Sequence, residues 1–123
     1  MSEDMSRLPP QVQERLLRLQ QLQQTLQSVM AQKQQVDAEQ NELDQTLTEL
    51  QKTADDAVIY KAIGSLLVKS EKAKTTTELT ERKELLTTRS TVLTRQEERL
   101  RTQVKEVQTK LQEDLNPVAP SSP

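Results

Sequence analysis

Residues 57–70 read Ala-Val-Ile-Tyr-Lys-Ala-Ile-Gly-Ser-Leu-Leu-Val-Lys-Ser, and this stretch decides the fold. It gathers β-branched residues and the only tyrosine, Tyr60, around the only glycine, Gly64. Such side chains favour strands, and a Gly-Ser pair between two short apolar runs favours a hairpin turn of type II′, in which glycine supplies the positive φ. The stretch therefore predicts a β-hairpin that pairs Ile63 with Leu66. A continued helix or a packed loop is the alternative, because Ala, Leu and Lys permit both.

Both faces of this hairpin are largely apolar. With alternate side chains on opposite faces, one face carries Ile59, Lys61, Ile63, Leu66 and Val68, and the other carries Val58, Tyr60, Ala62, Leu67 and Lys69. A lone hairpin is marginally stable in water, and its edges invite further strands. We therefore expect hairpins of several chains to close into an intersubunit β-barrel, which would serve as an oligomerisation hub. The residues expected to build the hub are Val58, Ile59, Tyr60, Ile63, Gly64, Leu66, Leu67 and Val68.

Long coiled-coil helices are predicted on both sides of the hairpin. After Pro10 neither proline nor glycine interrupts the sequence up to about Lys52, and apolar residues recur alternately three and four positions apart. This spacing, sustained over about six heptads, is typical of a coiled coil. Residues 9–53 are therefore predicted as the first helix. Residues 71–115, which keep the same period, are predicted as the second. The fold class is mostly α.

The two helices are nearly equal in length, and their connector is short, so they should fold back as antiparallel partners. The predicted seam is strongly apolar at the ends far from the hairpin and more polar at mid-length. Its polar mid-length positions are Lys33, Gln40, Lys83, Ser90 and Glu97. We expect firm pairing at the apolar end and looser pairing at mid-length, while the register stays open. Thr75 and Glu78 have the spacing of a capping box, although the second helix could also begin earlier.

Residues 1–8 and 116–123 are expected to form a disordered leader and tail, because prolines bound the helical pattern at both ends. Near these ends, apolar side chains lie beyond the seam at Leu8, Leu16, Leu17, Leu115 and Val118. A mobile, mildly apolar end suits weak and promiscuous binding of exposed apolar segments, and several arms together would add avidity. The alternative is that these leucines merely extend the seam.

The composition argues against several classes of function. The 123 residues include no histidine, no cysteine and one glycine. These counts leave no Ser–His dyad, no thiol nucleophile, no metal site built on histidine or cysteine, and no glycine-rich phosphate loop. We predict a protein that is not an enzyme and needs no metal or cofactor. Seventeen basic residues interspersed with 19 acidic ones give no basic face for nucleic acid. No apolar run could span a membrane, so we predict a cytoplasmic protein.

The order of long helix, hairpin and long helix resembles the β-type subunit of prefoldin, over about residues 8 to 115. The resemblance rests on Ile59-Tyr60-Lys61-Ala62-Ile63-Gly64-Ser65-Leu66-Leu67-Val68-Lys69, on Leu8-Pro9-Pro10-Gln11-Val12-Gln13, and on Arg95-Gln96-Glu97. A single hairpin points to the β-type, since α-type chains carry two. The resemblance implies a hetero-hexamer of two α-type and four β-type chains, with a double β-barrel as hub and six tentacles.

The resemblance also implies a function. Prefoldin is an ATP-independent chaperone, a holdase, that captures unfolded client proteins at the tentacle tips and transfers them to a group II chaperonin. It implies that Val12, Leu16, Leu111 and Leu115 touch client, alongside Leu8 and Leu17 near the same ends. A different hypothesis is a structural or tethering coiled coil that oligomerises through its hairpin without binding clients. A third, a membrane-fusion or trafficking coiled coil, is disfavoured by the missing anchors and the β segment at mid-chain.

Overall fold

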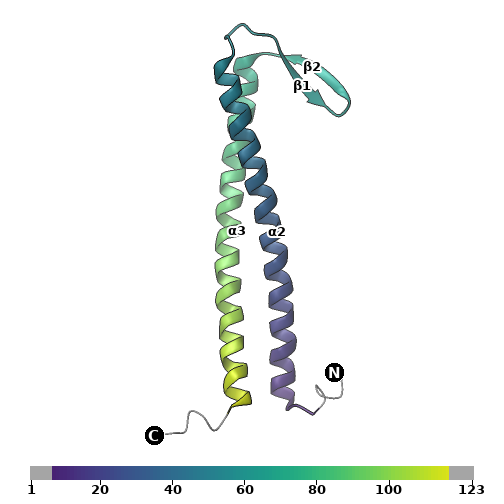
Figure 1. The fold of residues 1–123 in the computed structure, drawn as a ribbon, viewed down its shortest axis with the longest axis vertical. Helices are drawn as coiled ribbons and strands as arrows, with labels where there is room; N and C mark the ends of the chain where they lie inside the picture. Colours follow the sequence, from purple (N-terminus) through teal and green to yellow (C-terminus); the bar gives the residue numbers. More distant parts are fainter. Residues whose placement is uncertain (1–6, 117–123) are drawn as a thin grey trace. The chain divides into compact units, whose positions relative to one another are not determined.

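The computed structural model describes residues 7–116. The elements follow in the order α2 (Pro10–Lys52), β1 (Ile59–Ile63), β2 (Leu66–Ser70) and α3 (Lys72–Leu115) (Figure 1). The predicted fold class, two long helices with a β-hairpin between them, is confirmed. The intersubunit barrel involves further chains and stays a prediction. Most of the predicted leader and tail, at residues 1–6 and 117–123, lies outside the described residues.

The chain divides into two compact units. One, which we call the hairpin unit, comprises residues 33–92 and therefore contains both strands with the adjoining parts of α2 and α3. The other, the terminal unit, comprises the residues up to 32 and those from 93 onwards.

The first helix begins as its prolines dictate. The carbonyl oxygen of Pro9 accepts hydrogen bonds from the N–H groups of Val12 and Gln13, at 3.0 and 3.1 Å. Pro10 therefore occupies the first turn, where a missing N–H costs nothing. The Gln13 side chain also donates to the carbonyl oxygen of Leu8, at 2.7 Å, and so holds the residue before the prolines against the helix.

The hairpin has the predicted register, from Ile59 opposite Ser70 to Ile63 opposite Leu66. Gly64 adopts a φ of 59°, and no other described residue has a positive φ. A type I′ turn would need a positive φ at Ser65 as well, so the turn fits type II′, as its Gly-Ser sequence predicts. Side chains of one strand therefore alternate between two faces, with Lys61 and Val68 on one and Tyr60 and Lys69 on the other.

The sequence left two starts open for α3, and the structure has the earlier one. Glu71 takes the capping position, because its carbonyl oxygen accepts the first helical bond, from the N–H of Thr75 at 3.0 Å. Thr75 is thus inside the helix and buried, and it does not cap the helix. Its hydroxyl lies 2.8 Å from the Ser70 hydroxyl at the end of β2. That contact satisfies the buried hydroxyl and ties the strand to the helix.

In the hairpin unit, α2 and α3 pair through an alternation of apolar and polar contacts. Val36, Leu50 and Leu86 are buried. Between the helices, polar pairs join Gln40 to Thr87 at 3.0 Å, Glu39 to Arg82 at 2.7 Å, Asp44 to Lys83 at 2.7 Å and Asp37 to Ser90 at 3.4 Å. Exposed pairs of this kind add little stability each. Together they set the antiparallel register that the sequence left open, since a shift of either helix would separate all of them.

In the terminal unit the seam is apolar, as predicted. Its buried side chains are Val12, Leu22, Val29, Leu93 and Leu111. An ion pair between Arg15 and Asp114 lies toward one end of this seam. Toward the other, the Arg101 guanidinium lies 3.4 Å from the sulfur of Met30. Both contacts join α2 to α3 within this unit.

Candidate functional site

The hairpin exposes most of its apolar side chains within a single chain. We call these the hairpin surface, and they comprise Val58, Tyr60, Ile63, Leu66, Leu67 and Val68. Leu66 and Leu67, on opposite faces, keep 66% and 72% of their surface accessible, whereas Ile59 at the base of β1 is half-buried. Exposed apolar side chains gathered in this number on one short element mark an interaction site more often than an ordinary surface. Seven of the eight predicted hub residues are thus accessible for assembly, and Ile59 is partly so.

Polar contacts anchor the base of the hairpin to the helices of its own unit. The Lys61 ammonium lies 2.7 Å from Oε2 of Glu78 on α3. Lys72 donates to the carbonyl oxygen of Thr53 at 2.8 Å and lies 3.2 Å from a carboxylate oxygen of Asp55. Together with the Ser70–Thr75 contact, these pairs join both ends of the hairpin to the adjacent helix ends. The face that carries Lys61 is therefore turned toward α3.

The surroundings of Glu78 lower the pKa of its carboxyl group. The hydrogen bond from Lys61 lowers the pKa of the Glu78 carboxyl, and the positive charges of Lys61 and Lys74 act in the same direction. Desolvation opposes these effects by raising the pKa, but it does not outweigh them. The carboxylate form of Glu78 is therefore favoured.

The predicted client-binding residues of the terminal unit fall into two groups. Leu17 and Leu115 are exposed, at 55% and 58%, and Leu8 and Leu16 are half-buried. Val12 and Leu111 are buried in the seam, at 4% and 6%. Only the first group offers apolar surface directly. The second could reach another molecule only where the end of the helix pair opens.

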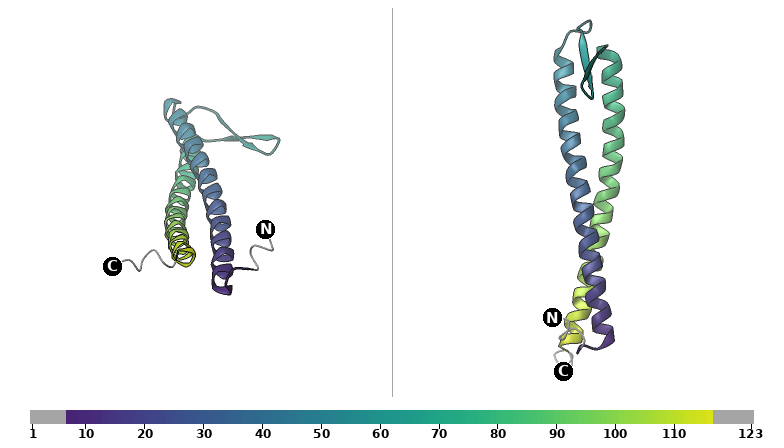
Figure 2. Two further views of the ribbon diagram at one scale, coloured as in Figure 1. Left: turned by 60° about the horizontal axis from the view of Figure 1, so that its bottom comes forward. Right: turned by 90° about the vertical axis from the view of Figure 1, so that its right-hand side faces the viewer.

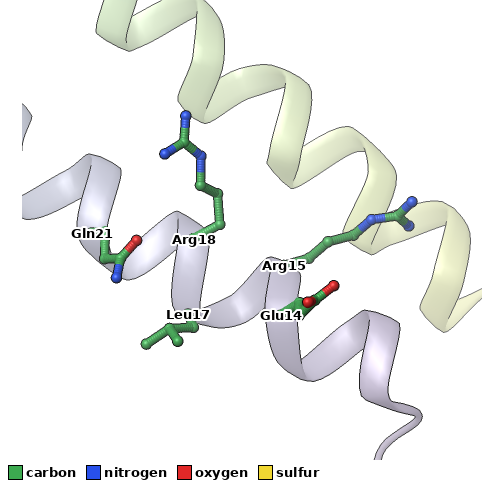
Figure 3. A pocket seen from close by; sticks show the side chains of 5 residues that line it. All are labelled: Glu14, Arg15, Leu17, Arg18 and Gln21. Atoms are coloured by element: carbon green, nitrogen blue, oxygen red, sulfur yellow. The ribbon is translucent and has the colours of Figure 1, made fainter.

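Figure 3 shows the surroundings of Leu17. Its side chain points away from α3, whereas Arg15 extends toward that helix, in keeping with its ion pair to Asp114. Glu14, Arg18 and Gln21 line a shallow hollow with Leu17 and Arg15. An exposed leucine rimmed by long polar side chains can contact an apolar segment while the rim stays hydrated.

Three exposed apolar residues, Met30, Leu85 and Val92, were not singled out from the sequence. Leu85 and Val92 lie on α3, seven residues apart, with 64% and 46% of their surface accessible. Their immediate neighbours in sequence, Leu86 and Leu93, fill the buried seam. A search for apolar residues at a fixed heptad position outside the seam would have found the pair.

The described residues contain neither a grouping of acidic side chains that could hold a metal ion nor, in either helix, an apolar stretch long enough to cross a membrane.

Comparison with known proteins gives consistent results. Residues 13–117 match the family model described as "Prefoldin subunit". A prefoldin subunit beta of Archaeoglobus fulgidus is 50% identical over 94% of this chain and 99% of its own length. A prefoldin subunit beta of Pyrococcus furiosus is 46% identical over 92% of this chain and 97% of its own. The crystal structure of the prefoldin beta subunit from Thermococcus strain KS-1 superposes with a TM-score of 0.82, at 44% identity, and covers 89% of this chain and 96% of that one.

Proposed function

We propose a holdase function for this chain, which belongs to the prefoldin family as a β-type subunit. Membership makes it a chaperone subunit, of a family that is not an enzyme family, and implies assembly with other prefoldin subunits. The finer proposal is that it binds unfolded proteins through its terminal unit without ATP, in the cytoplasm. It then transfers the bound proteins to a group II chaperonin. Its assembly partner is an α-type subunit, in a hexamer of two α-type and four β-type chains.

The observation that carries the proposal is the presence of two separate apolar surfaces on one chain. The hairpin surface belongs to the hairpin unit, whereas Leu17 and Leu115 belong to the terminal unit. Complete burial of a leucine-sized side chain contributes about 1.5–3 kcal/mol. Six such residues on the hairpin therefore supply a driving force for assembly through an intersubunit barrel. A few leucines on the terminal unit supply only weak contact, which suits reversible capture by several subunits at once.

The buried residues of the terminal unit give the proposal a dynamic component. Val12 and Leu111 lie in the seam near the Arg15–Asp114 ion pair. Helix ends fray more readily than helix centres, because their last backbone groups lack helical partners. Transient opening at this end would add Val12 and Leu111 to the apolar surface that Leu17 and Leu115 already present. Client binding would then select the opened state.

The experiment is suppression of aggregation by the complete complex. A chemically unfolded substrate is diluted into stoichiometric complex, assembled with its α-type partner, while light scattering is followed. We expect the native complex to suppress scattering and the double variant Leu17→Gln, Leu115→Gln to suppress it several-fold less. Ala31→Gln is the matched control, because Ala31 is an exposed apolar residue of the same unit that lies outside the proposed client-binding set. It should behave as the native chain.

Two outcomes would contradict the proposal. An intact complex that never suppresses scattering would favour a tethering coiled coil held together by its hairpins. Removal of residues 1–17 and 112–123 should abolish suppression and leave the mass of the complex otherwise unchanged. If that truncation dissolves the complex instead, the hub and the client-binding surface have been assigned to the wrong parts of the chain.

A further inference from the structure

Leu85 and Val92 form a second exposed apolar surface in the hairpin unit, which we call the α3 stripe. Both are one or two heptads beyond Glu78 on the same helix. A straight α-helix drifts by only about 20° per heptad, so the three side chains project from nearly the same side of α3. Because Glu78 contacts Lys61 of β1, the α3 stripe continues the helix face on which the hairpin is anchored.

The helix pair has no need of the α3 stripe. The seam in this region is filled by Leu86 and Leu93, which are 3% and 4% exposed, and Leu85 and Val92 lie outside it. Isolated exposed leucines are ordinary on protein surfaces. Here, however, the two apolar residues occupy the same heptad position as Glu78, which contacts the hairpin. The arginines at 82, 89 and 95 lie within one helical turn of Leu85 or Val92. Arginine is enriched in protein interfaces relative to the rest of the surface.

The chain's own hairpin does not cover the α3 stripe. Figure 1 shows the two strands leaving the joined ends of α2 and α3 sideways, with the turn directed away from the helices, and the left view of Figure 2 agrees. Ile63, Leu66 and Val68 lie on the hairpin face that Lys61 turns toward α3, yet they stay 43–66% exposed. The two apolar surfaces diverge from the Lys61–Glu78 contact and leave each other uncovered.

We propose that the α3 stripe is the docking surface for the hairpin of a neighbouring prefoldin subunit. The inference rests on the hub assembly proposed above. A barrel encloses one face of each hairpin, so the other face needs a cover that its own helices do not supply. In a barrel the hairpins of different subunits lie side by side, so a hairpin that projects sideways from its own subunit lies beside the helices of a neighbour. Such a contact lets an α3 stripe receive the Ile63, Leu66 and Val68 face of an adjacent chain.

Client protein is the competing occupant, and position argues against it. The α3 stripe belongs to the hairpin unit and begins two turns beyond a residue that touches β1. The exposed leucines assigned to client, Leu17 and Leu115, belong to the other unit. The position of the α3 stripe, on the helix face to which the hairpin is anchored, therefore favours a subunit contact.

Site-specific photocrosslinking tests this assignment. A benzophenone amino acid replaces Leu85, and the variant is assembled with the α-type partner and irradiated; the crosslinked peptides are then identified by mass spectrometry. We expect crosslinks to the hairpin segment of a neighbouring subunit of either type. The same probe at Thr91 is the control. Thr91 is exposed in the same turn as Val92 but projects about 100° away from it, so its yield on hairpin peptides should be at least ten-fold lower.

A second variant separates subunit docking from client binding. Leu85→Gln, Val92→Gln should raise the concentration for half-assembly by about ten-fold or more, and the complex formed at high concentration should suppress aggregation like the native one. Crosslinks from position 85 to client alone, or to no hairpin peptide in an assembled complex, would overturn the inference. So would an unchanged assembly midpoint. A native chain that fails to assemble at all would contradict the hub proposal rather than the docking inference alone. A mass measurement of the native mixture shows this independently of the variants.

Discussion

At the scale of single residues, the contact between Lys61 and Glu78 makes the hairpin's placement dependent on pH. The pKa of Glu78 is lowered in the folded chain, chiefly by the hydrogen bond from Lys61. An ordinary glutamate titrates near pH ~4.3. Between the lowered value and the ordinary one, the unfolded chain binds more protons than the folded chain, so stability rises with pH. The contribution is complete above the ordinary value and is lost as the pH falls through the folded one.

Glu78→Gln should therefore be slightly less stable than the native chain at neutral pH, and the difference should vanish in acid. The measurement is urea unfolding of both chains from about pH 7 to about pH 3, together with hydrogen exchange of the hairpin amides. The effect is expected to be small, because both side chains are partly hydrated. Glu81→Gln, on an exposed residue of the same helix, is the control. A difference between native and Glu78→Gln chains that does not shrink as the pH falls would show that the charge on Glu78 is not its cause.

Residues also show where sequence reasoning succeeds and where it does not. The register of the hairpin could be predicted because one glycine, Gly64, is the only residue that suits the positive φ of its turn. The capping role of Thr75 could not be excluded from its spacing to Glu78, since the same spacing occurs inside a helix. In the structure Thr75 lies inside the helix, where its hydroxyl contacts the Ser70 hydroxyl. The sequence cannot show that contact, because it depends on how the strand and the helix are placed.

At the scale of elements, the heptad pattern identifies the seam of each helix but not the alignment of the two. The apolar spacing is a property of one helix, and the apolar residues at the heptad positions of α2 are all buried or half-buried: Val12, Leu19, Leu22, Leu26, Val29, Val36, Leu43, Leu47 and Leu50. Alignment depends on pairs between helices, such as Glu39 with Arg82 and Asp44 with Lys83. Many alignments place some acid near some base, so the sequence alone does not select one. The α3 stripe was not predicted, because the leucines of the seam dominate the apolar pattern of α3.

Leu85 and Leu86 offer a test at this scale, because neighbours in sequence have opposite environments. Leu86 is 3% exposed and Leu85 is 64% exposed. Leu86→Ala should lower the free energy of unfolding of the isolated chain by about 2–5 kcal/mol, because it leaves a cavity in the seam. Leu85→Ala should change it by no more than about 0.5 kcal/mol. Urea unfolding followed by circular dichroism measures both. Equal losses would mean that α3 is rotated relative to the structure described here.

At the scale of the whole molecule, the chain carries surfaces that it does not cover itself. The α2–α3 seam buries apolar residues of both helices, whereas the hairpin surface remains accessible on both faces. No rearrangement of two strands can bury both of their faces, because side chains alternate across the sheet. The intersubunit barrel was predicted from this argument and remains a proposal, whereas the hairpin itself is observed. What a single chain leaves open is which neighbour covers which face.

Tyr60 can report this coverage without a large perturbation, because it is the only tyrosine of the chain and lies on the hairpin surface with 61% of its area accessible. Chain labelled with 3-fluorotyrosine should give a single fluorine resonance. In the isolated chain at low concentration, that resonance should show the solvent isotope shift of an exposed ring. After mixing with unlabelled α-type subunit, we expect a displaced and broadened resonance whose isotope shift is several-fold smaller, because assembly removes the ring from water. Labelled Leu17→Gln, Leu115→Gln chain should change identically, since those substitutions lie in the terminal unit. A resonance that keeps its full isotope shift in a complex of verified mass would place Tyr60 outside the subunit contacts, and the hairpin could not then be the hub.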